Sequence, residues 1–263
     1  MKGINLQKRI LLIFFCMFFF VATAKAQVVP NAMYQVSTIN ALIQGVYEGE
    51  ISVGELKKYG DFGIGTYDGL DGEMVVLDGQ DYHVTSTGNV VAADDKVKTP
   101  FANVLYFKPE LFGEINDAKS FSDIEKALNS IIKDTNYIYA IRIDGVMNLQ
   151  TRAIPKKGKP YPTLAEAAKT QSVFNLENAH GTIVGIWCPQ YMNGINVPGY
   201  HLHFISDDRK SGGHILSGGI VHGKVQVARI ADFQMVLPNG DAFKNAALNS
   251  DYSKELRAVE QSN

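Results

Sequence analysis

Short stretches rich in β-branched and aromatic residues recur along the chain after residue 26, and most are bounded by Gly, Asp or Pro. Runs of this length predict β-strands, because such side chains pack well on a pleated surface and the bounding residues favour turns. The predicted strands cover Glu73–Leu77, Asp81–Ser86, Val104–Phe107, Tyr137–Ile143, Thr182–Trp187, Tyr200–Ile205, His214–Leu216 and Lys224–Ile230.

Four segments have helical patterns instead. Ser122–Glu125 and Thr163–Glu166 both read Ser/Thr-x-x-Glu, in which the two end side chains cap backbone N–H groups at a helix start. Val53–Tyr59 and Tyr252–Val259 are the other predicted helices. Because helices do not alternate regularly with strands, a doubly wound fold is not expected. We expect an α+β fold with mixed or antiparallel β-sheets, in two packed layers or subdomains, and a few short helices.

The first 26 residues have the layout of a secretory signal peptide. Lys2, Lys8 and Arg9 form a basic front, Ile10–Ala22 is an apolar run, and Ala24–Ala26 has the A-x-A pattern of a cleavage site. The run of about thirteen residues is shorter than the roughly 20 that a membrane-spanning helix needs. We therefore expect cleavage after residue 26 and a periplasmic or secreted protein without a membrane anchor. No linker divides residues 27–263, which we expect to form one catalytic domain.

The charge of the chain argues against two kinds of binding partner, and its cysteine count argues against a disulfide. The chain has 25 Lys and Arg and 27 Asp and Glu, a formal net charge of −2. Removing residues 1–26 takes away four basic residues and no acid, which leaves 21 basic and 27 acidic side chains and a net charge of −6. Such a chain lacks the basic footprint of a protein that binds nucleic acid or an anionic membrane. Cys188 would be the remaining cysteine, so no intramolecular disulfide is expected, and its apolar surroundings predict a buried small hydrophobe.

Three histidines form the sharpest local signal for chemistry. His201 and His203 alternate along a predicted strand, so their side chains share one face at a spacing of about 7 Å. The polar turn 206–213 is typical of a hairpin, which would bring His214 beside the pair. Three imidazoles around one open position are typical of catalytic zinc. A bare H-x-H is also common in histidines that bind nothing, so both interpretations stay open from this pattern alone.

Other candidate residues are less distinctive. Glu73 follows a turn-rich segment and begins an apolar strand, so it is either a partly desolvated acid or a solvated charge at a strand end. Arg142 and Arg152 lie on or beside predicted strands, and each could hold a carboxylate or form an ordinary ion pair. The remaining histidines, His83, His180 and His222, are expected to be structural or exposed. His222 is the strongest candidate for an exception, because it lies close in sequence to the histidines 201–214. No P-loop, G-x-G-x-x-G, G-x-S-x-G or H-E-x-x-H occurs, which disfavours nucleotide-binding, serine-hydrolase and zincin interpretations.

Several segments together resemble the α-acetolactate decarboxylase family. The resembling segments are Gly60–Met74, Tyr139–Gly145, Thr151–Pro155, Gly199–Ser206 and Gly212–His214. Their order and spacing match the family, and the likeness runs from about Tyr34 to about Glu260. A chance H-x-H would not achieve this agreement.

The resemblance implies a homodimeric, typically zinc-dependent enzyme that converts (S)-2-acetolactate to (R)-acetoin and CO₂ through a metal-stabilised enediolate. The family's metal-binding histidines fall on His201, His203 and His214. Its functional arginine falls on Arg152 rather than Arg142. Its two glutamates fall on Glu73 and Glu260, and the placement of Glu260 rests on a short motif.

Two other classes of protein compete with this interpretation. The first is a cupin-like metal-dependent oxygenase or isomerase, since cupins also place H-x-H on a strand. Asp207 and Asp208 stand where the cupin glutamate is usual, and Ile195 replaces the usual glycine. The second is an exported protein that binds a metal or a metabolite without catalysis. Such a protein would not need Glu73 and Arg152 beside the histidines, so their placement distinguishes it from an enzyme.

Overall fold

Seven short strands form the first of two large sheets in the computed structural model, which describes residues 29–260. In spatial order they are β14 (Asp232–Val236), β1 (Ala32–Val36), β8 (Ala102–Leu105), β3 (Phe62–Thr66), β4 (Glu73–Leu77), β5 (Gln80–Val84) and β6 (Val90–Ala92). All neighbours in this sheet are antiparallel except β1 and β14, which are parallel. The predicted signal peptide lies outside the described residues.

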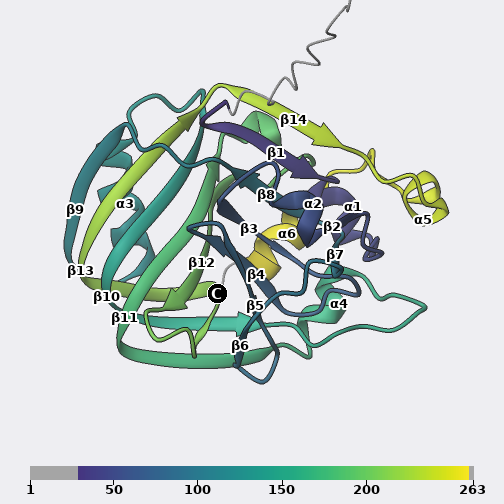
Figure 1. The fold of residues 1–263 in the computed structure, drawn as a ribbon, viewed down its shortest axis with the longest axis horizontal. Coiled ribbons are helices and arrows are strands. Elements are labelled where there is room, and N and C mark those ends of the chain that lie inside the picture. The colour runs from purple at the N-terminus through teal and green to yellow at the C-terminus, as the bar shows by residue number, and fades with distance from the viewer. Residues whose placement is uncertain (1–28, 261–263) are drawn as a thin grey trace, which may run out of the picture.

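Five longer strands form the second sheet, which is strongly curled (Figure 1). They are β10 (Ile138–Ala153), β11 (Ser172–Cys188), β12 (Gly199–Ser206), β13 (Gly212–Ile230) and β9 (Leu111–Ala118). The sheet curls so far that β13 pairs with β10 over most of its length and with β12 at its first residues. A separate small pair joins β2 (Ile51–Ser52) to β7 (Lys98–Thr99). The predicted α+β class with two sheet layers is therefore confirmed.

The helices are short and lie around the sheets. They are α1 (Ile39–Ile43), α2 (Val53–Leu56), α3 (Phe121–Ile131), α4 (Leu164–Ala168), α5 (Asp241–Asn245) and α6 (Ser253–Glu260), with a 3₁₀ turn η1 (Gln190–Met192). The capping box predicted at Ser122–Glu125 was wrong: Ser120 caps α3, and its hydroxyl accepts from the Asp123 N–H at 3.2 Å. At α4 the expected cap is present, because the Thr163 hydroxyl accepts from the Glu166 N–H at 3.4 Å.

Two strands predicted separately form one continuous strand, and glycines explain the difference. The expected strands around His214 and Lys224 merge into β13, which runs through glycines that interrupt the apolar pattern. A Cβ at Gly219 would stand 2.2 Å from the carbonyl oxygen of Ala118, so the neighbouring backbone leaves no room for a side chain. Glycine in a strand often marks such a close approach rather than an end of the strand.

A hydrophobic core joins the two sheets. Phe62, Val75 and Leu77 from the seven-stranded sheet pack in one cluster with Ala140 and Ile186 from the curled sheet. Ile205 of β12 belongs to the same cluster. Full burial of a large apolar side chain contributes about 1.5–3 kcal/mol, so the cluster holds β4 against β12. That contact places the first residue of β4 beside the predicted histidine site.

The structure tests the expectation for Cys188. Cys188 is buried as predicted, with 1% of its surface exposed, and burial raises the pKa of its thiol. Within residues 29–260, no helix is long and apolar enough to span a membrane.

Candidate metal and active site

Strand register brings the three histidines and one arginine into a row. His201 and His203 lie two residues apart on β12, so their side chains share one face. His203 is directly opposite His214 across the β12–β13 hairpin. On the other edge of β13, His214 is paired with Arg152 of β10. The hairpin expected from the polar turn is therefore present, and it delivers His214 to the pair.

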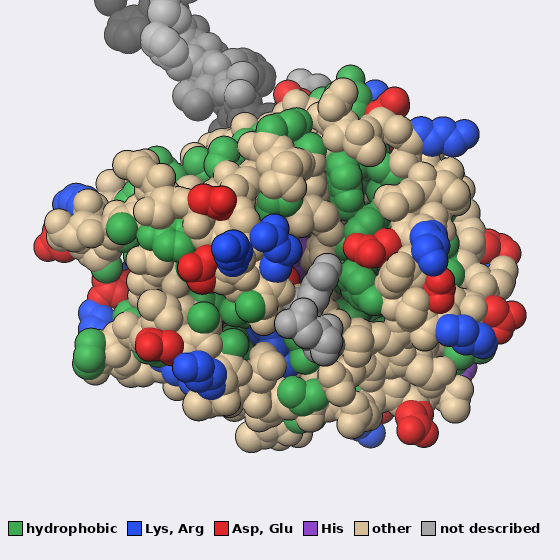
Figure 2. Space-filling model, turned by 180° about the vertical axis from the view of Figure 1, so that it is seen from behind, with side chains coloured by type: hydrophobic (Ala, Val, Ile, Leu, Met, Phe, Trp, Pro, Cys, Tyr) green, Lys and Arg blue, Asp and Glu red, His purple; other side chains and the backbone are tan. Residues whose placement is uncertain are grey.

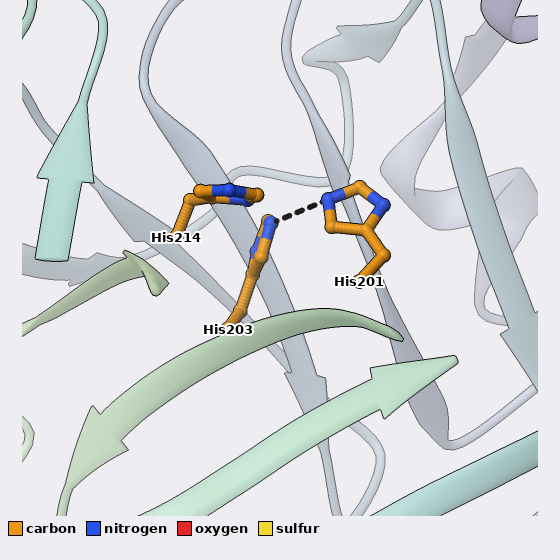
Figure 3. Close-up of side chains that lie close together, drawn as sticks. All are labelled: His201, His203 and His214. Atoms are coloured by element: carbon orange, nitrogen blue, oxygen red, sulfur yellow. Dashed lines mark hydrogen bonds between the residues drawn. The ribbon is translucent and has the colours of Figure 1, made fainter. Parts of the chain in front are cut away.

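The histidine side chains converge in the interior (Figure 3). His201 Nε2 lies 3.2 Å from His203 Nε2, and one ligand nitrogen from each ring lies within 4.8 Å of the others. His201, His203 and His214 are 7%, 1% and 1% exposed. Burial lowers the pKa of His201 to about 3 and lowers the pKa values of the other two as well. Neutral, buried imidazoles that face one point are the form in which histidine binds a metal.

Backbone carbonyls determine which nitrogens carry protons. His203 Nδ1 lies 2.9 Å from the carbonyl oxygen of Met74, and because a carbonyl only accepts, Nδ1 must donate. The lone pair of His203 is then on Nε2, which faces His201. Such a second contact commonly orients a histidine that binds a metal. His214 Nε2 donates to the carbonyl oxygen of Glu260 at 3.0 Å, so a metal bound at that atom would replace both the proton and this contact.

Three charged side chains surround the histidines. Arg152 Nη1 donates to Glu73 Oε1 at 2.7 Å, and its Nη2 lies 4.0 Å from Glu260 Oε1. Glu73 Oε2 lies 3.6 Å from His203 Nε2. Glu260 Oε2 lies 3.7 Å from the Nε2 atoms of both His201 and His214, and it has no hydrogen-bond partner among the described residues. The site therefore places two carboxylates and one guanidinium within 4.0 Å of the cluster or of one another.

Burial controls the electrostatics of the two carboxylates. Glu73 is 6% exposed, and its desolvation raises its pKa to about 7, although Arg152 acts in the opposite direction. Desolvation also raises the pKa of Glu260 to about 7, again against the effect of Arg152. The interpretation of Glu73 as a solvated charge at a strand end is therefore wrong. Strongly shifted acids around a buried cluster are typical of a functional site.

A small cavity lies at this cluster. Its volume is about 30 Å³, and the polar groups that line it include Thr66, Glu73, Arg152 and Glu260. Its other walls are mostly apolar and come from α1, α4 and nearby loops. The resemblance singled out neither Thr66 nor the Met74 carbonyl, and no local sequence pattern marks them.

The remaining candidates lie away from the cluster. Arg142 is half-buried and forms ion pairs with Asp78 at 2.7 Å and Asp144 at 2.8 Å, so it is a structural residue. His83 packs against the Tyr67 ring, with centroids 4.3 Å apart. The last two are exposed on the curled sheet, as expected of structural or surface residues: they are His180 and His222. His222, the most plausible exception, does not join the site.

Comparisons with known proteins identify the family of this chain. A family model described as alpha-acetolactate decarboxylase matches residues 33–250. The alpha-acetolactate decarboxylase of Bacillus subtilis is 42% identical over 234 residues, which cover 88% of this chain and 92% of the relative. That of Methanosarcina mazei is 41% identical over 232 residues, with coverage of 88% and 81%.

Solved structures show the same fold. The crystal structure of the Bacillus subtilis alpha-acetolactate decarboxylase superposes with a TM-score of 0.85 at 42% identity, covering 88% of this chain and all of that one. A Staphylococcus aureus protein described as similar to alpha-acetolactate decarboxylase superposes with a TM-score of 0.82 at 29% identity. The family match spans Glu73, Arg152 and the three histidines, whereas Glu260 lies beyond its last residue. The chain belongs to the alpha-acetolactate decarboxylase family.

Proposed function

We propose that this chain decarboxylates (S)-2-acetolactate to (R)-acetoin and CO₂. The observation that carries the proposal is the buried group of three histidines, two glutamates and one arginine at the contact between the two sheets. The names of the relatives, at about 40% identity over most of the chain, support the same reaction. Family membership excludes the cupin-like enzyme. The presence of Glu73 and Arg152 beside the histidines favours an enzyme over a binding protein.

The reaction needs a place for an electron pair and a source for a proton. Cleavage of the bond to the carboxylate releases CO₂ and leaves its electron pair on the hydroxyl-bearing carbon. The pair forms a double bond to the ketone carbon, and the negative charge moves to the ketone oxygen of an enediolate. A proton must then reach the carbon that lost CO₂, which gives acetoin. Interactions that form only as this charge develops lower the barrier, while equal binding of substrate does not.

We propose that Arg152 binds the substrate carboxylate. Its guanidinium is buried, one arm already holds Glu73, and its Nε has no partner among the described residues. A planar guanidinium can hold a carboxylate through two parallel hydrogen bonds. This contact orients the bond that breaks and weakens as neutral CO₂ departs.

We assign proton delivery and hydroxyl orientation to Glu73 and Glu260. The two carboxylates come from β4 and α6 and approach the cluster from different elements. A fixed donor on one side of the planar enediolate protonates one face only. Their fixed positions therefore support the single enantiomer of acetoin.

We propose that His201, His203 and His214 hold one divalent metal, most simply zinc. The converging nitrogens, their neutral state and the donor on His203 Nδ1 fit such an ion. When bound, the metal supplies positive charge that stabilises the oxygen on which negative charge develops. Three imidazoles also accept iron or manganese, so metal analysis has to identify the ion.

We also propose that the protein acts outside the cytoplasm as a homodimer. The basic, apolar and A-x-A pattern of residues 1–26 supports export and a mature domain of residues 27–263. The dimer follows from the family resemblance. N-terminal sequencing of protein from the source cells tests cleavage, and sedimentation tests the dimer.

The activity itself is tested with purified chain and racemic 2-acetolactate. We expect acetoin and CO₂ in equal amounts and one acetoin enantiomer by chiral chromatography. Glu73→Gln keeps the size of the side chain and removes its acid, so turnover should fall at least about 100-fold while the metal stays bound. Full turnover by Glu73→Gln would contradict its role, and no acetoin from the metal-loaded parent chain would refute the function.

A further inference from the structure

A second, larger cavity adjoins the histidine site. It has a volume of about 160 Å³ and lies between α6 and residues 189–198. Glu260 borders both this outer cavity and the inner one of about 30 Å³. One water needs roughly 10–15 Å³ of such volume, so the inner cavity has room for about two waters and the outer one for about ten. 2-Acetolactate is larger than two waters, and the outer cavity, which shares Glu260 with the inner one, offers the additional room.

The walls of the two cavities differ in polarity. Apart from its polar groups, the inner cavity is lined by buried apolar side chains such as Leu42, Phe101 and Leu164. A carboxylate that approached along these apolar side chains would lose hydration and gain few polar contacts. The outer cavity is lined in part by Gln190 and Asn193, which are both exposed, so it reaches the surface. An anion can therefore approach from this side while keeping polar contacts.

Arg257 is the basic residue that lines the outer cavity. It lies three residues before Glu260 on α6, and residues at this spacing share a face of a helix. Arg257 is exposed at the mouth, whereas Arg152 is buried at the inner end. Arg257 thus lines the outer cavity and Arg152 lines the inner one, while Glu260 lines both.

The overall charge of the molecule does not attract an anion. The formal net charge is −2, and Figure 2 shows acidic and basic side chains intermixed over the face that it draws. Steering of a charged substrate then depends on charges at the mouth of the site itself.

We propose that 2-acetolactate enters between α6 and residues 189–198, and that Arg257 recognises its carboxylate at the mouth before Arg152 holds it. This inference rests on the proposed decarboxylase function. It assigns Arg257 to substrate capture and leaves the chemical step to the inner residues. Removal of its charge should therefore lower kcat/KM and affect kcat little.

The test compares Arg257→Gln with Lys254→Gln. Lys254 lies on the same helix and is exposed, but it does not line the cavity, so the same charge is removed outside the path. At low ionic strength we expect kcat/KM of Arg257→Gln to fall about 5-fold, with kcat within about 2-fold of the parent. The difference should shrink in about 0.5 M salt, which screens exposed charges. Equal kcat/KM for the two variants would overturn the role of Arg257.

A second pair of variants tests the route. Gln190→Trp adds bulk inside the mouth, and Lys254→Trp adds the same bulk on the same helix as Arg257 but outside the cavity. We expect kcat/KM to fall at least about 10-fold in the first and to stay within about 2-fold in the second. An unhindered Gln190→Trp would overturn the route. If the metal-loaded parent chain makes no acetoin, the proposed function fails and this inference fails with it. If the parent is active but Arg257→Gln and Gln190→Trp keep the kcat/KM of their controls, only this inference is overturned.

Discussion

The buried acid Asp81 allows a quantitative prediction about the free energy of unfolding. Asp81 lies on β5, which pairs with the strand that carries Glu73, and its side chain is fully buried. One carboxylate oxygen accepts a hydrogen bond from the Tyr67 hydroxyl, and the other has no partner among the described residues. Burial raises the pKa of Asp81 from 3.8 to about 6, against the smaller opposing effects of the Tyr67 hydrogen bond and Lys57.

The sign of the effect follows from proton binding. The folded chain holds the Asp81 proton more tightly than the unfolded chain, so the unfolded chain ionises first as pH rises. The contribution of Asp81 to the free energy of unfolding should therefore fall between about pH 4 and pH 6 and level off above that. A pKa difference of about two corresponds to about 3 kcal/mol.

Asp81→Asn removes this ionisation while keeping an oxygen that can accept from Tyr67. Urea unfolding, followed by the fluorescence of Trp187, should show the stability of the variant rising relative to the parent by up to about 3 kcal/mol from pH 4 to pH 7. The new amide N–H group has no ready partner and costs about 1–3 kcal/mol, but this cost does not depend on pH. The change with pH is therefore the quantity to compare.

Asp117→Asn provides the matched control. Asp117 is 80% exposed at its side chain, and its left-handed φ of 54° is one that Asn also adopts. Its ion pair with Lys119 is exposed, so the free energy of unfolding of Asp117→Asn should stay within about 1 kcal/mol of the parent. Parallel curves for Asp81→Asn and the parent would show that burial does not shift this acid, and would refute the reasoning.

Three further predictions concern the site and the fold. His203→Ala should reduce bound metal, measured by mass spectrometry, to less than about a tenth of the parent value. His180 is exposed and outside the cluster, so His180→Ala should keep the metal. Equal metal in both variants would remove His203 from the ligand set. Arg152→Lys should lower kcat/KM for acetoin formation at least about 100-fold, because lysine cannot hold Glu73 and a substrate carboxylate with one planar fork; a loss below about 3-fold would contradict this. Gly219→Ala should lower stability by about 2 kcal/mol and Tm by several degrees, since its Cβ would meet a carbonyl 2.2 Å away; an unchanged Tm in calorimetry would contradict the close approach.

The histidine cluster could be predicted from sequence because its geometry is local. Alternation along β12 puts His201 and His203 on one face, and a hairpin brings His214 opposite. Glu73 and Arg152 are 79 positions apart, and no local pattern shows that they meet. Their pairing depends on packing between the two sheets, and only the family resemblance indicated it. Glu260 depends in the same way on where α6 docks.

The fold was predictable where burial follows a simple period. β4 was predicted with its observed bounds because all five of its residues are buried and the four that follow Glu73 are apolar. β11 was predicted only in its buried half, since its first nine residues are exposed or half-exposed and mix polar with apolar side chains, as a loop does. β9 was missed because its apolar residues follow no period of two and only Ile115 and Ala118 of this edge strand are buried. Partner strands supply the hydrogen bonds there, and a sequence pattern does not show them.

The central claim is that the three buried histidines hold a metal on which decarboxylation depends. The most direct test measures acetoin formation from 2-acetolactate and metal content on the same purified chain, before and after treatment with a chelator and after zinc is returned. We predict about one metal per chain, loss of both metal and activity with the chelator, and recovery of both with zinc. Undiminished acetoin formation by metal-free protein would contradict the account.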